Sequence, residues 1–166
     1  TGGSSGALDI FTGDSIDGAG GDVRIKVGGG DTGGGGNMTL AAGETLSADE
    51  SGGNVLLTSG AGLSRSGMIA VTTEKVSEGS SGSISLATGS GSGPSGSVVV
   101  ETGDASTGKQ GDIVIKSGKS AETGGNVLIS AGTANSNGGA IILNTGASST
   151  ANSGEMQLHS ASAEFG

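Results

Sequence analysis

The sequence predicts an all-β protein, folded as a flattened two-sheet parallel β-solenoid of eleven strands. The first observation is an eight-residue motif that begins on glycine, as in Gly125–Gly132 (Gly-Asn-Val-Leu-Ile-Ser-Ala-Gly). The second is its recurrence every 14–17 residues along the chain. The third is a side-chain period of two within each copy, which strands show and helices do not. A fixed short period of this kind is typical of stacked-repeat proteins.

Each copy has the same order of residue types. Numbered from its leading glycine at position 0, a copy carries apolar residues at positions 2 and 4 and a small residue at position 6, with Val27 as the one larger residue there. An extended backbone places these three positions on one face, which we expect to point inward. The leading glycines are spaced 15, 15, 17, 14, 15, 14, 15, 14, 14 and 15 residues apart: Gly6, Gly21, Gly36, Gly53, Gly67, Gly82, Gly96, Gly111, Gly125, Gly139 and Gly154.

Two copies per coil are needed to bury these faces. A coil of about 15 residues would set one apolar strand against a polar loop, whereas a coil of about 30 residues sets two apolar faces together, in sheets about 10 Å apart. The loops after odd copies are also more acidic than those after even copies. We therefore expect about five and a half coils in a single repeat domain, residues 1–166, which is a segment of a solenoid and fits a portion of a longer chain. The alternative is an antiparallel meander with seven-residue hairpin loops.

Composition excludes several classes of protein. The 166 residues include 38 Gly and 1 Pro, with 31% apolar and 1% aromatic residues, so burial must occur in thin aliphatic layers. A net charge of −9 argues against nucleic-acid binding, which needs Lys and Arg. No apolar run of about 18 residues is present to span a membrane. Zero Cys excludes disulfides, and the acidic, Gly/Ser/Thr-rich composition favours an extracellular or cell-surface location.

Two glycine-rich stretches imitate ligand-binding loops. Gly103–Lys109 matches a phosphate-binding loop, but Gln110 follows where Ser or Thr would hold magnesium, and no helix pattern comes after it. Gly33–Leu40 matches one calcium β-roll nonapeptide without its neighbouring nonapeptides. We interpret both stretches as solvated turns.

The remaining candidates for chemistry are isolated residues. Asp49 and Glu50 could offer oxygen ligands to calcium, but no ligand spacing recurs, so a solvating edge is the better interpretation. Asn37 begins the one glycosylation sequon, and His159 is the one histidine, expected to be exposed and inert. The sequence therefore predicts no enzyme, and it assigns no catalytic, cofactor-binding or metal-binding residue and no cofactor.

Four consecutive copies carry an aliphatic residue at position 3, which should point outward. Such exposed apolar side chains are typical of association surfaces and predict lateral association between molecules: Val99, Val114, Leu128 and Ile142. Neither end of the chain shows a helix pattern or charged block that would cap a solenoid, which also predicts end-to-end stacking.

The Gly-x-Val-x-Ile-x-Thr-Gly copies, clearest at Gly96–Gly103, Gly111–Gly118 and Gly139–Gly146, resemble tandem-repeat surface proteins. Such repeats occur in microalgal, diatom-like wall or adhesive proteins and in bacterial secreted adhesins. The resemblance implies a structural protein of an extracellular fibre, cell wall or adhesin stalk that associates with itself through β-stacking, with a polysaccharide or mineral surface as a further partner. The alternative is a module that binds ice or polysaccharide on a flat face.

Overall fold

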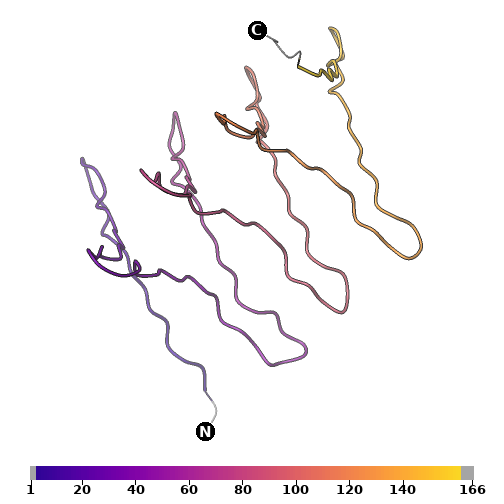
Figure 1. Cartoon of the computed structure of the whole chain (residues 1–166). Coiled ribbons are helices and arrows are strands. Elements are labelled where there is room, and N and C mark those ends of the chain that lie inside the picture. Colours follow the sequence, from indigo (N-terminus) through magenta and orange to yellow (C-terminus); the bar gives the residue numbers. More distant parts are fainter. Residues whose placement is uncertain (1–2, 162–166) are drawn as a thin grey trace. The chain divides into compact units, whose positions relative to one another are not determined.

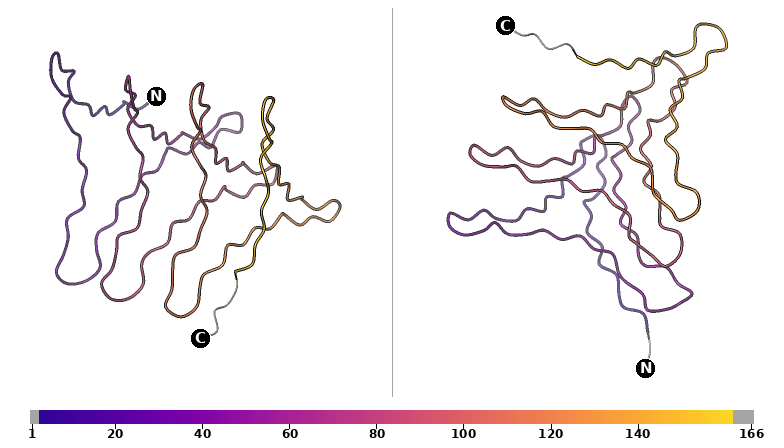
Figure 2. Two further views of the ribbon diagram at one scale, coloured as in Figure 1. Left: turned by 90° about the horizontal axis from the view of Figure 1, so that it is seen from above. Right: turned by 45° about the vertical axis from the view of Figure 1, so that its right-hand side comes forward.

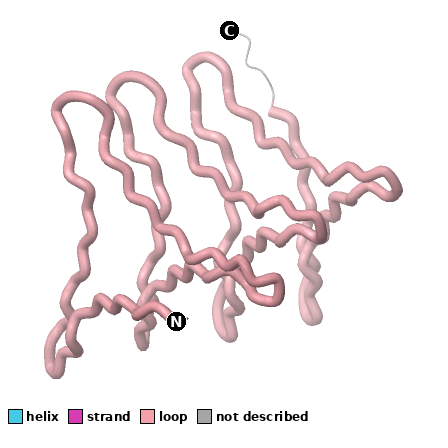
Figure 3. Tube along the Cα trace, turned by 90° about the horizontal axis from the view of Figure 1, so that it is seen from below, coloured by secondary structure: helices cyan, strands magenta, loops and turns pink. Residues whose placement is uncertain are grey.

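The computed structural model describes residues 3–161, and this part of the chain contains no helix and no strand. Figure 1 shows a continuous trace in which extended runs alternate with narrow loops, and Figure 3 draws all of the described residues as loop. No residue of this part is buried, and it has no hydrophobic core. The chain is therefore extended and lacks regular secondary structure throughout the described residues.

The predicted β-solenoid is wrong. The eleven segments are extended, but they form no ladder with one another, because the only backbone–backbone hydrogen bonds within residues 3–161 are four bonds that close loops. The inward faces have nothing opposite them: Ile129, which the predicted solenoid would bury, is 65% exposed. The alternative antiparallel meander is absent for the same reason.

The division of the chain into segments and loops is nevertheless correct. The described chain turns or bends at ten places, and each lies in a loop between two of the glycine-led segments; both views in Figure 2 show the same alternation of extended runs and loops. The segments themselves contain no bend. The turning points are residues 16–18, 31–33, 48–49, 63–64, 77–79, 92–93, 106–108, 121–122, 135–137 and 149–151.

The chain divides into two parts, Thr1–Ile84 and Ser85–Gly166. The boundary falls inside the segment led by Gly82, at a point where the sequence shows no change in composition. Each part consists of the same repeated unit, an extended segment followed by a loop.

Composition explains why a correct period does not produce a sheet. Glycine loses more conformational freedom on ordering than any other residue, and there are 38 glycines to order. Each repeat offers only two large apolar side chains on its inward face in return, and there is no Trp or Tyr among them to add buried area. Alternation therefore sets which face each side chain occupies without supplying enough burial to close a single chain on itself.

Candidate functional site

The most regular feature of the structure is the contact at the base of each loop, which we call the neck. A neck consists of the small residue at position 6 of one segment and the leading glycine of the next. A Cβ atom placed on the leading glycine would lie 3.3–3.6 Å from the side chain of that small residue at nine of the ten necks, and 2.7 Å from it at Gly36. The neck therefore explains why the repeat pairs a small residue with a glycine.

Four necks are also closed by a backbone hydrogen bond. The amides of Gly53, Gly67, Gly139 and Gly154 donate to Gly43, Gly60, Gly132 and Gly146 respectively, over 2.8–2.9 Å. At these four necks a Cβ atom on the leading glycine would also lie 3.2–3.6 Å from the backbone nitrogen of the acceptor residue. Glycine at position 0 thus lets the two backbones approach closely enough to bond.

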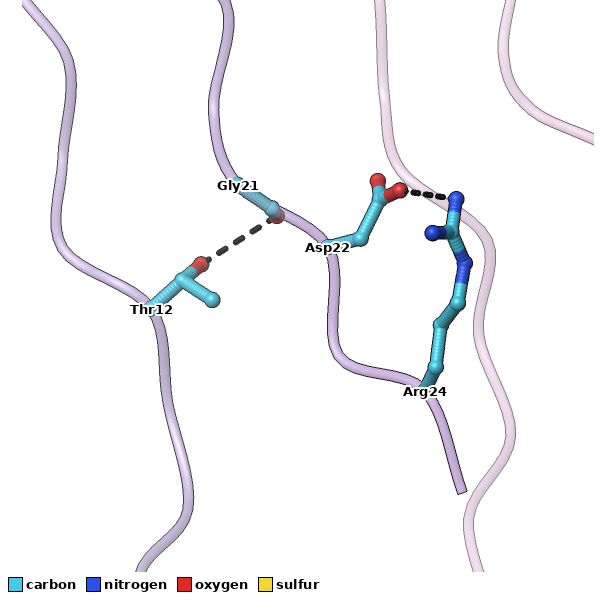
Figure 4. A network of polar contacts seen from close by, with 4 residues as sticks. All are labelled: Thr12, Gly21, Asp22 and Arg24. Carbon is cyan, nitrogen blue, oxygen red and sulfur yellow. Dashed lines mark hydrogen bonds and ion pairs between the residues drawn. The ribbon is translucent and has the colours of Figure 1, made fainter. Parts of the chain in front are cut away.

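The first described neck has a different bond. The hydroxyl of Thr12 donates to the carbonyl oxygen of Gly21 over 3.4 Å (Figure 4), and a Cβ atom on Gly21 would lie 3.4 Å from the Thr12 methyl group. A threonine at position 6 can therefore provide both the apolar contact and a polar one.

Two position 6 residues are the least exposed in the described chain. Ser59 and Ala131 are half-buried, whereas every other residue from 3 to 161 is exposed. Both belong to necks with a backbone hydrogen bond, those of Gly67 and Gly139. Within the described residues, the side chains that are least exposed to solvent therefore lie at necks.

The necks also cover part of the next segment. Position 2 side chains that follow a neck are 47–60% exposed, whereas Leu8, which has no neck before it among the described residues, is 86% exposed. Position 4 side chains, one step further along, are 65–84% exposed. Cover therefore declines with distance from the neck, and most of each apolar face is open to solvent.

Four loops reverse direction through a left-handed residue. Gly33, Gly79 and Gly108 have φ of +82°, +93° and +85°, and each stands three residues before a leading glycine. Asp17, with φ of +59°, has this role in the loop before Gly21. Glycine adopts such angles without steric cost, and Asp tolerates them better than most residues.

The outward aliphatic residues are exposed as expected, but they are not distinguished from the inward ones. Val99, Val114, Leu128 and Ile142 are 70–86% exposed, a range that overlaps that of position 4 on the opposite face. Apolar side chains are therefore uncovered on both faces of these segments. The sequence does not reveal this exposure. The alternation of apolar and polar residues shows which face a side chain occupies, but it does not show whether that face is covered.

Lys109 of the apparent phosphate-binding loop forms an ion pair with a carboxylate. Its ammonium nitrogen lies 3.0 Å from Oδ1 of Asp112, and Gly108 before it makes the left-handed turn. The second ion pair of the described residues joins Arg24 to Asp22 (Figure 4). Both pairs use an aspartate at position 1 of a segment, a feature that is visible in the sequence.

The other candidate residues stand alone. Asn37, Asp49 and Glu50 are exposed, and Gly33–Leu40 contains only the left-handed turn at Gly33. Nε2 of His159 lies 3.2 Å from Oε1 of Gln157, also in the open. Within residues 3–161, no three His, Asp or Glu side chains form a group that could hold a metal ion, and there is no pocket.

Comparison with models of protein families, with curated proteins and with solved structures finds no match. The described chain includes no helix that is long and apolar enough to cross a membrane. The repeated segments themselves are therefore the main indication of function.

Proposed function

We propose that this chain is a structural repeat protein of an extracellular fibre, cell wall or adhesin stalk, and that it works by associating with further copies of itself. The observation that supports this most directly is the repeated exposure of aliphatic side chains on extended segments. Ile113 and Ile115, for example, are 52% and 73% exposed on a segment whose backbone is extended. Water is a poor solvent for such a surface, and association is the usual means of covering it.

A second copy of the chain is the partner whose pattern fits. The backbone N–H and C=O groups inside the segments take part in no backbone–backbone hydrogen bond within the described residues, so each segment presents donors and acceptors at the strand period. An identical segment offers the complementary groups at the same spacing, together with its own apolar residues. Pairing between copies would satisfy both requirements at once, as in cross-β assemblies.

The composition is consistent with a structural role outside the cell. Acidic residues in the loops, such as Asp49 and Glu50, keep the chain solvated between segments, while small residues leave the segments free to approach. Gly, Ser and Thr dominate the loops, as they do in the surface proteins that the repeats resemble.

Sedimentation velocity over a range of concentrations tests the proposal, with infrared spectra recorded on the same samples. We expect larger species at higher concentration, accompanied by an amide I band typical of paired strands. Replacing Ile113 and Ile115 by Ser should weaken association. The same replacement at Ile16 and Leu63, exposed aliphatic residues in loops, serves as the control and should change little. Monomers at every concentration, or equal effects of the two variants, would contradict the proposal.

A further inference from the structure

Two segments carry a charge pattern that no other copy has. Gly21–Gly28 (Gly-Asp-Val-Arg-Ile-Lys-Val-Gly) and Gly111–Gly118 (Gly-Asp-Ile-Val-Ile-Lys-Ser-Gly) both have Asp at position 1 and Lys at position 5. Positions 1, 3 and 5 of an extended chain share one face, opposite the apolar residues at positions 2 and 4. On the face formed by positions 1, 3 and 5, each of these segments is therefore acidic at its beginning and basic at its end.

The two segments are also exposed to the same degree. The side chains of Asp22 and Asp112 are 65% and 66% exposed. Lys26 and Lys116 are exposed as well. Ile25 and Ile115, which lie between the charged residues in the sequence, are 72% and 73% exposed. Within residues 3–161, the backbone groups of Asp22–Lys26 and Asp112–Lys116 form no hydrogen bond. The backbone between each Asp and its Lys is therefore free to pair.

We infer that Gly21–Gly28 of one copy pairs with Gly111–Gly118 of another in antiparallel orientation, with each Asp opposite a Lys. In that register position 1 faces position 5, so Asp22 meets Lys116 and Lys26 meets Asp112. Opposite charges directly across an antiparallel pair are stabilising, and like charges are destabilising. A parallel, in-register arrangement would set Asp against Asp and Lys against Lys.

Arg24 disfavours the pairing of Gly21–Gly28 with itself. It stands at position 3, the centre of the register, and faces Val114 when the two different segments meet. If Gly21–Gly28 paired with itself, Arg24 would face a second Arg24, which is destabilising. The ion pairs that the single chain forms, Arg24 with Asp22 and Lys109 with Asp112, are exposed surface pairs and do not hold the aspartates in place.

This inference rests on the proposed self-association and adds its direction. A contact between two different surfaces of the same molecule is heterologous, and it generates an open-ended assembly unless the rotation closes a ring. A chain that joins residues 21–28 to residues 111–118 of the next copy therefore grows by head-to-tail addition.

Charge-swap variants test this at constant composition and constant net charge. The single swap is Asp22→Lys with Lys26→Asp, and the double swap adds Asp112→Lys with Lys116→Asp. The single swap turns both attractive pairs into repulsive ones, so it should raise the dissociation constant from sedimentation by about tenfold, and the double swap should restore it. In 1 M NaCl, where screening acts over roughly 3 Å, the differences should shrink.

Each outcome separates this inference from the proposed function. Association of the native chain that is unchanged by the single swap overturns the pairing and leaves the structural role standing. Stronger association of the single swap overturns the orientation, because that variant favours parallel pairing. If the effect of the swap does not depend on protein concentration, the two segments pair within one chain. That result overturns pairing between copies. A native chain that remains monomeric overturns the proposed function as well.

Discussion

The amide of Gly139 donates a 2.9 Å hydrogen bond to the carbonyl oxygen of Gly132. A Cβ atom on Gly139 would lie 3.3 Å from the Gly132 nitrogen and 3.4 Å from the Ala131 Cβ, closer than side chains ordinarily approach. Ala131 is in turn one of the two half-buried residues of the described chain. The glycine and the small residue are thus two halves of one contact, and it holds the loop between them closed.

Replacing Gly139 by Ala should open this neck. The added Cβ atom forces the two backbones apart, and loss of the hydrogen bond should speed amide exchange at residue 139 by about tenfold, in line with the net value of such a bond. Gly138→Ala is the matched control, because its Cβ atom would have only the Gly132 oxygen near it, at 3.8 Å. Equal exchange rates in the two variants would show that the neck is not sterically set.

The neck at Gly36 should show strong coupling between its two residues. A Cβ atom on Gly36 would lie 2.7 Å from Cγ1 of Val27, and valine is stiff about χ1. We expect Gly36→Ala to abolish nuclear Overhauser contacts between residues 27 and 36, and Val27→Ala to restore them in the double variant. Gly125→Ala, with 3.5 Å to Ser117, should keep the corresponding contacts. Retained contacts in Gly36→Ala alone would contradict the account.

The left-handed turn before Gly82 should depend on Gly79. An L-residue at φ of +93° costs roughly 1–2 kcal/mol, so Gly79→Ala should move the residue out of this conformation. Three-bond HN–Hα couplings across residues 77–80 report that change. Gly89→Ala provides the control, since φ there is not positive and its Cβ atom would meet nothing within 4 Å. Unchanged couplings in Gly79→Ala would show that this loop reverses in another way.

The sequence allowed correct prediction of the places where the chain turns, but not of how its segments pack. Glycine, small polar residues and alternation are local signals, and they located every loop and every position 6 residue. Packing depends on how much apolar area the segments can cover between them, and two aliphatic residues per repeat, such as Val127 and Ile129, do not cover one another in the single chain. The necks could have been anticipated, because a small residue recurs eight or nine residues before most of the leading glycines.

Replacing Ala131 by Leu distinguishes a shared core from separate necks. A two-sheet core would be overpacked by the larger side chain, whereas a neck should respond only locally. The larger side chain has no core to disturb, but it extends towards Gly139, where a Cβ atom would lie only 3.4 Å from the Ala131 Cβ. We expect faster amide exchange at Gly139 in Ala131→Leu, with no change at Gly67, whose neck is built by Ser59. A simultaneous change at Gly67 would indicate a shared core and contradict a chain made of separate necks.

Residue-resolved amide hydrogen exchange over a series of protein concentrations tests the central claim most directly. In dilute solution we expect protection only at hydrogen-bonded neck amides such as Gly139, and free exchange throughout 112–116. At high concentration alternate amides within 22–26 and within 112–116 should become protected together, as copies pair. Protection of 112–116 at the lowest concentration, or none at the highest, would contradict the account.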